Sequence, residues 1–203
     1  MTPEPPTGRA IFVGMSDDRV ERILDAAYEC FTRHGIRRTT MDDIAAAAEM
    51  SRPAVYQYVR NKDDAFRRLA GRLFDGGLAQ ATAGAAADGP LTERLHRVLS
   101  AKLELTLRLW DDSPHAAELL DAGARLSGDL VEQYELATRA LIADMMASAA
   151  DRGEITLDVV APGDVAEIAV AFIHGLETTR VNPDRPRQRL RQGVHLLVAG
   201  LTP

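Results

Sequence analysis

Residues 35–66 read GIRRTTMDDIAAAAEMSRPAVYQYVRNKDDAF and hold the strongest local signals in the chain. Thr40 is a good N-cap for a short helix, and the acidic residues after it suit the positive end of a helix dipole. Beyond a tight connection, Ser51 can cap another helix, with Pro53 in its first turn, where the missing amide hydrogen costs little. Asn61 can cap the next helix. Two short helices joined by a tight turn are therefore expected, which is helix-turn-helix geometry.

A longer helix is expected before this stretch, starting near Asp17, because apolar residues recur there at the spacing of one helix face. They are Val20, Ile23, Leu24, Ala27 and Phe31. Gly35 can take the left-handed conformation that commonly ends a helix. The first three helices are expected to be about 18, 9 and 8 residues long.

The rest of the chain also has helical periodicity, and no segment alternates convincingly with the period of two typical of a strand. A connector rich in Ala and Gly is expected to end in a loop at Asp88, Gly89 and Pro90, and Pro114 marks another helix start. Further helices are expected over residues 91–110, 127–151, 164–180 and 184–201. The predicted fold class is all-α.

Composition limits the classes of protein that fit. The 203 residues are 46% hydrophobic, enough for a real core, and the single cysteine, Cys30, excludes a disulfide framework. No run of about 18 apolar residues is present, so no membrane partner is expected. Residues 1–16 hold three prolines and lack the pattern of a secretory signal, so they are interpreted as a flexible arm, and the expected location is cytoplasmic.

The charge is unevenly distributed. Residues 1–70 contain 11 Lys and Arg and 11 Asp and Glu, whereas residues 71–203 contain 13 and 19, which accounts for the whole net charge of −6. An acidic chain is at first sight a poor partner for nucleic acid. Because the acidity is confined to the second part, that objection weakens for the first.

Residues 35–66 resemble the DNA-binding domain of the tetracycline-repressor (TetR) family of bacterial regulators. The resemblance rests on residues that match the family pattern in register, namely Gly35, Thr39, Thr40, Ile44, Ala45, Ala48, Ser51, Tyr56, Tyr58, Val59, Lys62 and Asp63. It implies an N-terminal three-helix helix-turn-helix DNA-binding domain over residues 17–70. A helical-bundle ligand-binding and dimerisation domain would follow over residues 71–203.

The resemblance and the helix-turn-helix geometry together give a set of expected DNA contacts. The set is Thr40, Met41, Ser51, Arg52, Pro53, Ala54, Tyr56, Gln57, Tyr58 and Lys62. Arg52 has the fork that can bridge guanine O6 and N7, Gln57 can pair with adenine, and Lys62 suits a phosphate at a helix N-terminus. Pro53 is equally well interpreted as a favourable helix start, and Tyr58 as partly buried against the first helix.

For the second domain the resemblance implies a dimer formed by the last two helices and a small-molecule pocket. The expected interface residues are Ile168, Phe172, Leu176, Leu190, Val194, Leu197 and Leu201, although the same apolar faces could pack within one chain. Candidate pocket residues are Trp110, His115, Tyr134, Met145, Phe172 and His174, each of which is also compatible with a core position.

These observations predict a dimeric, ligand-responsive transcriptional regulator, a repressor that binds a palindromic operator and is released by a small-molecule effector. Its expected partners are operator DNA, a second copy of itself and that effector. No catalytic motif, cofactor motif or metal signature is found, so the prediction includes no enzyme activity, no cofactor and no metal. The alternative is an all-helical ligand-binding or interaction protein that no longer reads DNA.

Overall fold

The computed structural model describes residues 10–177 and 184–202. Within them the chain forms eight helices and no strand, as the all-α prediction requires. The helices are α1 (Ala10–Arg38), α2 (Met41–Ala47), α3 (Arg52–Val55), α4 (Lys62–Ala86), α5 (Leu91–Asp112), α6 (Ala116–Asp151), α7 (Pro162–Glu177) and α8 (Asp184–Ala199). None of the helices described is long and apolar enough to cross a membrane.

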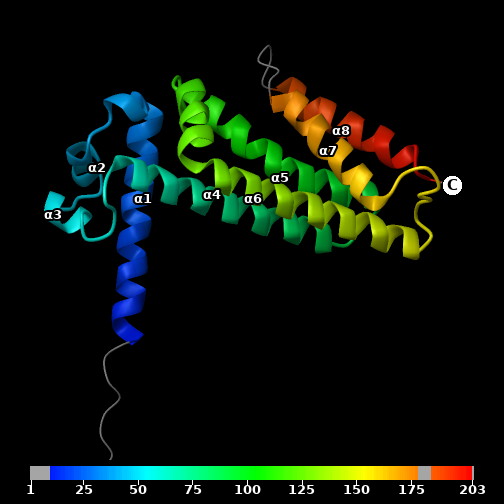
Figure 1. Cartoon of the computed structure of the whole chain (residues 1–203), viewed down its shortest axis with the longest axis horizontal. Helices are drawn as coiled ribbons and strands as arrows, with labels where there is room; N and C mark the ends of the chain where they lie inside the picture. Colours follow the sequence, from blue (N-terminus) through cyan, green and yellow to red (C-terminus); the bar gives the residue numbers. More distant parts are fainter. Residues whose placement is uncertain (1–9, 178–183, 203) are drawn as a thin grey trace, which may run out of the picture.

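The helices form an N-terminal part and a C-terminal part, and the long helices α4 and α6 belong to both. Helices α4, α5 and α6 run along the long axis of the molecule, with α7 and α8 packed beside them (Figure 1). Helix α1 crosses the other end, where it contacts α2, α4 and α6, and α3 lies beside α2 (Figure 1). The helix-turn-helix is thus at the opposite end of the molecule from α7 and α8.

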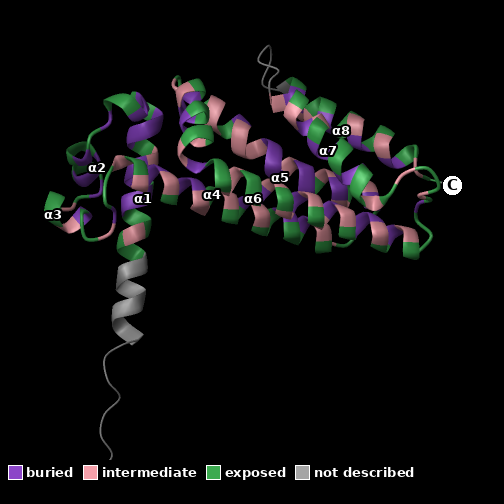
Figure 2. Cartoon of the chain, viewed as in Figure 1, coloured by how far each residue is buried: buried purple, intermediate pink, exposed green. Residues whose placement is uncertain are grey.

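Two separate clusters of buried side chains correspond to these parts (Figure 2). The N-terminal core is centred on α1 and α2, and the C-terminal core on α5 and α7. Helix α4 contributes Phe66 to the first and Ala81 to the second, and α6 contributes Leu119 to the first and Ile142 to the second. Because both helices belong to both cores, a shift of either one moves the two parts relative to each other.

The local signals around the helix-turn-helix are confirmed. Gly35 has the positive φ expected of it (φ 76°, ψ 160°), but it interrupts α1 rather than ending it, because helical structure resumes and continues to Arg38. Thr40 accepts a hydrogen bond from the Asp43 amide, as an N-cap does, and Asn61 accepts one from the Asp64 amide at 2.8 Å. These caps satisfy amides that would otherwise lack partners at the helix starts.

Other boundaries differ from the prediction. Helix α1 begins at Ala10 rather than near Asp17, so residues 10–16 are helical; residues 1–9 of the predicted arm lie outside the described residues. Helix α3 covers only Arg52–Val55 and continues as a turn, because Tyr56 already ends the helical bonding. The expected helix from residue 127 is the second half of α6, whose backbone breaks at Ser127 (φ −139°, ψ 24°).

Candidate functional site

Helix α2 is fixed at its start by a reciprocal cap. The Thr40 hydroxyl accepts from the Asp43 amide at 3.2 Å, and the Asp43 carboxylate accepts from both the hydroxyl and the amide of Thr40, at 2.7 and 2.8 Å. These hydrogen bonds lower the pKa of Asp43. The cap holds the start of α2, and with it the tight turn that leads to α3.

Helix α3 presents exposed side chains immediately after that turn. The Ser51 hydroxyl accepts from the Ala54 amide at 3.4 Å, and Pro53 lies in the first turn, which confirms its interpretation as a helix start. Arg52, Pro53 and Gln57 are exposed, while Val55 between them is buried. One face of this segment therefore packs on the N-terminal core and the other is open to a partner.

The guanidinium of Arg52 is held above this surface by two neighbours. It donates to Asp42 of α2 at 3.1 Å and to the Tyr56 hydroxyl at 3.5 Å, and it lies 5.6 Å from the centre of the Tyr56 ring. The Arg52–Asp42 pair is exposed to solvent, so it contributes little to stability and can open readily. The guanidinium of Arg52, which can donate two hydrogen bonds at once, is thus oriented at the surface but remains able to leave its partners.

The other predicted DNA-contact residues differ in how exposed they are. Tyr58 is half-buried, and its hydroxyl accepts from Arg19 of α1 at 3.2 Å, which matches the alternative of packing against the first helix. Lys62 donates to the Arg37 carbonyl at 3.3 Å at the start of α4. Met41 is only 8% exposed and belongs to the N-terminal core, so its side chain does not face a DNA partner.

The first half of α6 is joined to the N-terminal part by side chains. Glu118 accepts from the Arg37 amide at 2.8 Å, and its other oxygen lies 2.6 Å from where a Cβ on Gly35 would be. The buried Ser113 hydroxyl donates to the Thr32 carbonyl at 2.7 Å. Arg37 and Glu118 also line an open groove of about 420 Å³ between the two parts. The C-terminal end of α1, around Gly35 and Arg37, is thus in direct contact with α6.

The break in α6 is spanned by α4. Arg67 donates to the Leu126 carbonyl at 3.1 Å, just before Ser127, and forms a two-pronged ion pair with Asp129 just after it. The Arg67 hydrogen bonds hold the pKa of Asp129 at about 2. Ser127 is fully buried. Arg67 therefore bridges both sides of the discontinuity.

A buried polar cluster lies in the C-terminal part, where α5, α6 and α7 meet. Lys102 is 6% exposed and lies between Glu135 and Glu177, and His174 lies next to Glu135. Tyr134 is equally buried beside Lys102. Sequence reasoning found Tyr134 and His174 but missed the other three. The available signal was Lys102 itself, a charged residue on the apolar face of residues 91–110.

The remaining predicted pocket residues do not join this cluster as one set. His115 lies at the junction near Gly35, Met145 is buried in the C-terminal core, and Trp110 is half-buried near the end of α5. Phe172 packs against α8, where a Cβ on Gly193 would lie 2.3 Å from its ring. These residues were predicted to line a pocket because of their side-chain chemistry. In the structure they lie on separate helices and do not line one common site.

The predicted interface residues are also divided. Leu176, Leu190 and Val194 are buried in the C-terminal core of their own chain, which corrects the prediction that they face a second copy. Phe172, Leu197 and Leu201 are half-buried against the same core. Ile168 is 54% exposed, as an interface residue should be, and Leu196, which was not predicted, is 72% exposed.

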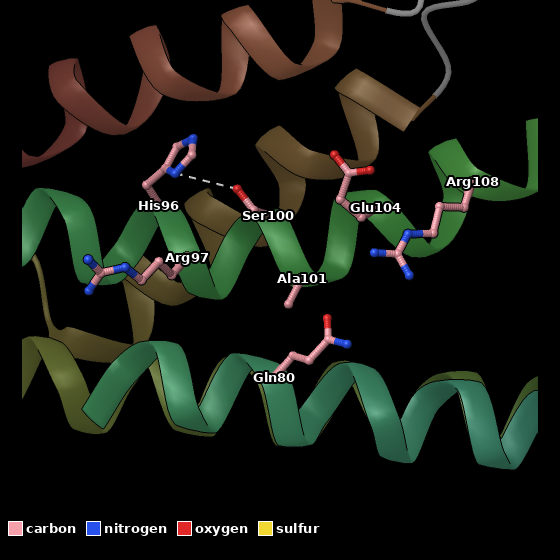
Figure 3. A pocket seen from close by; sticks show the side chains of 7 residues that line it. All are labelled: Gln80, His96, Arg97, Ser100, Ala101, Glu104 and Arg108. Carbon is pink, nitrogen blue, oxygen red and sulfur yellow. Dashed lines mark hydrogen bonds between the residues drawn. The ribbon is translucent and has the colours of Figure 1, made fainter. Parts of the chain in front are cut away.

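A shallow groove of about 330 Å³ follows the outer side of α5 next to α4 (Figure 3). Its lining residues include His96, Ser100 and Glu104, and His96 Nδ1 lies 3.5 Å from the Ser100 hydroxyl. Glu104 in the same groove forms a two-pronged ion pair with Arg187 of α8 at 2.7 and 2.9 Å. Among the described residues, no group of three or more His, Cys, Asp and Glu side chains could hold a metal ion.

Two tyrosines are expected to ionise only at unusually high pH. Burial, followed by the hydrogen bond to Asp112, raises the pKa of Tyr28 to about 12, and burial raises that of Tyr134 to about 12. Raised pKa values in the folded state mean that their contribution to stability is intact below pH 10 and is lost as the pH rises towards 12. Phenolate absorbance should show two of the four tyrosines titrating near pH 12. If Tyr134→Phe removes a step near pH 10 instead, the burial argument is wrong.

The exposed surface of α3, its capped approach through α2 and the helical bundle behind it define an all-α protein with an N-terminal helix-turn-helix. Comparison with known proteins identifies the group more closely: residues 23–69 match the family model described as bacterial regulatory proteins, tetR family. The match covers the helix-turn-helix part of the chain, which therefore resembles that of the TetR family of transcriptional regulators.

Individual relatives agree with this resemblance. An uncharacterized HTH-type transcriptional regulator of Bacillus subtilis, YhgD, is 31% identical over 105 residues, which are 49% of this chain and 55% of YhgD. The chain thus spans about half the length of this curated relative. Among solved structures, FadR from Bacillus subtilis in complex with stearoyl-CoA aligns with a TM-score of 0.67 at 19% identity, over 89% of this chain and 98% of FadR.

A second solved structure, SmeT, is the repressor of the Stenotrophomonas maltophilia multidrug efflux pump SmeDEF. It aligns with a TM-score of 0.65 at 20% identity, over 91% of this chain and 90% of SmeT. At this level of identity both structures establish the fold alone, over about nine tenths of the chain.

Proposed function

We propose that this protein is a dimeric repressor that binds a palindromic operator and is released from it by a small-molecule effector. The observation that carries the proposal is the exposed donor set of Arg52 and Gln57 on the capped segment after α2. A short helix in this setting can enter the major groove with its early side chains at the base edges. SmeT, which has the same fold, supports the choice of a repressor.

In this proposal the exposed residues divide into two kinds. Arg52 and Gln57 read bases, and the small apolar Pro53 and Ala54 can approach a thymine methyl. Lys62, at the N-terminus of α4, contacts phosphate, where its charge adds to that of the helix end. Ser51, Tyr56 and Tyr58 can donate hydroxyl hydrogen bonds to the DNA backbone, and Thr40 can do so if its hydroxyl leaves Asp43; such contacts fix the register of the protein on DNA.

Dimerisation is proposed to use the outer face of α7 and α8. Ile168, Ala171 and Gly175 are exposed and share one face of α7 by their spacing. The contact between Phe172 and Gly193 sets the register of α7 against α8, and Leu196 on α8 is exposed in the same way as Ile168 on α7. Small residues beside exposed apolar ones allow two copies to approach closely.

The effector is proposed to act by shifting the population between two arrangements of the dimer. Helix α4 begins at Lys62 and ends in the C-terminal core, so it can carry a change from one part to the other. Helix α6 can also carry such a change, because Glu118 contacts the end of α1 while Glu135 belongs to the buried cluster. Arg67 couples the two helices at the break.

One observation favours the alternative of a helical ligand-binding protein that no longer reads DNA. The N-terminal 70 residues are neutral, and Arg52 is already paired with Asp42. Fluorescence anisotropy with the upstream DNA of its own gene, at several salt concentrations, distinguishes the two. Tight, salt-dependent binding that exceeds binding to random DNA supports the regulator, and equal weak binding to both supports the alternative.

Replacing Arg52 with alanine is expected to relax base preference at one position in each operator half-site. The loss should be about 1–3 kcal/mol of discrimination, the contribution of one good bidentate contact to a base. Binding to a set of operators with single base changes measures it. An equal loss on operator and random DNA would rule out base reading by Arg52.

Replacing Lys62 with alanine is expected to weaken binding to all sequences, because a phosphate contact carries no base information. The slope of log K against log salt should fall in magnitude by about 1 for each copy that binds. The measurement is the same anisotropy titration repeated at four or more salt concentrations. An unchanged slope would mean that Lys62 does not contact phosphate.

A further inference from the structure

The buried cluster at the junction of α5, α6 and α7 has an unusual balance of hydrogen-bond donors and acceptors. Lys102 Nζ lies 3.9 Å from Glu135 Oε1 and 3.6 Å from Glu177 Oε1. Hydrogen bonds between nitrogen and oxygen are about 2.7–3.2 Å long, so neither carboxylate accepts one from Lys102 here. The ammonium group is buried between opposite charges with its N–H donors poorly used.

The two carboxylates, in contrast, already have close partners. Glu135 accepts from Arg139 at 3.0 Å and lies 2.7 Å from His174 Nε2. Glu177 accepts from the Thr106 hydroxyl at 3.1 Å. The acidic groups therefore have closer partners than Lys102, whose ammonium group pairs with them only at 3.6 and 3.9 Å.

Tyr134 supplies a second unused donor at the same place. Its hydroxyl is buried and has no hydrogen-bond partner among the described residues, and Lys102 Nζ lies 5.8 Å from the centre of its ring. Burial raises the pKa of this phenol, and the neighbouring Thr138 hydroxyl donates to the Tyr134 carbonyl at 2.8 Å. A buried unsatisfied donor is costly, so one in a native fold calls for an explanation.

The surroundings of the phenol are apolar and closely fitted. The Tyr134 ring stacks on Phe74 of α4, with centroids 5.2 Å apart. A Cβ on Gly77 would lie 3.1 Å from the Tyr134 hydroxyl and 2.8 Å from Leu105. The lack of a side chain at Gly77 leaves the space that the hydroxyl fills, next to apolar groups on α4 and α5.

We propose that this cluster binds the anionic oxygen group of an amphipathic small molecule, of the carboxylate class, with Lys102 and Tyr134 as its donors. The apolar body of the molecule lies against the C-terminal core beside Phe74 and Leu105. The inference deepens the proposed function and rests on it only in identifying this molecule with the effector. A cationic ligand fits less well, because Lys102 already lies between the two carboxylates.

The chain offers an unusually direct experiment, because Lys62 and Lys102 are its only lysines. In NMR spectra of the full-length protein made with isotope-labelled lysine, a series of straight-chain carboxylates of increasing length is titrated in. The matched alcohols and primary amines of the same chain lengths serve as controls. The proposal expects the Lys102 signal to shift with carboxylates while the Lys62 signal stays in place.

Thermal unfolding of two variants provides an independent readout. The best carboxylate of the series should raise the melting temperature of the wild type, and Lys102→Met should lose most of that rise. Tyr134→Phe keeps the stacked ring and removes only the unpaired hydroxyl. It should therefore fold with an unchanged or higher melting temperature and bind the carboxylate several-fold more weakly, even if Lys102→Met folds poorly.

The outcomes separate this inference from the proposed function. Absence of a Lys102 shift with every carboxylate, an equal or larger shift with the amines, or full retention of binding by Tyr134→Phe would overturn it. Operator DNA should instead shift the Lys62 signal, so failure of DNA binding would leave the carboxylate result unaffected. Both arms use the same protein sample.

Discussion

Replacing Phe31 with alanine is expected to lower the free energy of unfolding by about 3–5 kcal/mol, the usual cost of truncating a fully buried aromatic side chain. Phe31 is 1% exposed in the N-terminal core, and its ring meets that of Phe66 edge to face, with centroids 5.6 Å apart. This contact joins α1 to the start of α4. Alanine would leave a cavity and remove this contact between α1, which supports the helix-turn-helix, and α4, which continues into the C-terminal core.

The effect should be measured by urea unfolding, monitored by circular dichroism, with operator binding determined on the same samples. Val159→Ala is the matched control, since Val159 is 92% exposed and its truncation should change stability by less than about 0.5 kcal/mol. We expect Phe31→Ala to lose operator binding at temperatures where α4–α8 remain helical. A loss of less than 1 kcal/mol would show that the N-terminal core is not closed around this side chain.

The parts of this molecule that could be predicted from the sequence are those fixed by local chemistry. Thr40, Ser51 and Asn61 cap helices because their side-chain oxygens reach amides within three residues. Gly35 takes a positive φ because it lacks a Cβ. Such effects depend on a few consecutive residues, so the caps and turns of the helix-turn-helix follow from the sequence, whereas the burial of Met41 depends on packing and was missed.

The candidate effector site could be predicted only in part, because it depends on how three helices pack. Lys102, Glu135 and Glu177 come from α5, α6 and α7, and no spacing along the chain shows that their side chains meet. Tyr134 was selected for its chemistry, but its missing hydrogen-bond partner is a property of the packed state. Only a packed structure reveals which donors remain unused.

The interface prediction was limited by a different ambiguity. Helical periodicity indicates that Leu190 and Val194 lie on an apolar face, but it cannot say whether that face meets the same chain or a second one. The structure assigns both to the C-terminal core. Leu196, only two positions beyond Val194, points away from that core and is 72% exposed. The exposed apolar residues of α7 and α8 are therefore the ones to test for dimerisation.

Replacing Leu196 with glutamate is expected to convert the protein to a monomer and to weaken operator binding by about 10²–10⁴-fold. The first effect follows because a carboxylate buried at an interface without a partner loses its hydration. The second follows because a dimer that engages two half-sites gains affinity through effective concentration, which a monomer lacks. Folding should be unaffected, since Leu196 makes little contact within its own chain.

Sedimentation analysis gives the oligomeric state, and anisotropy with a whole operator and with a single half-site gives the affinities. Val159→Glu introduces the same charge at an exposed apolar position outside α7 and α8, so it should remain dimeric and bind the operator normally. Leu196→Glu should bind the half-site as well as the wild type does, because its helix-turn-helix is intact. A Leu196→Glu protein that stays dimeric would place the interface elsewhere, and one that becomes monomeric but keeps full operator affinity would remove dimerisation from the binding mechanism.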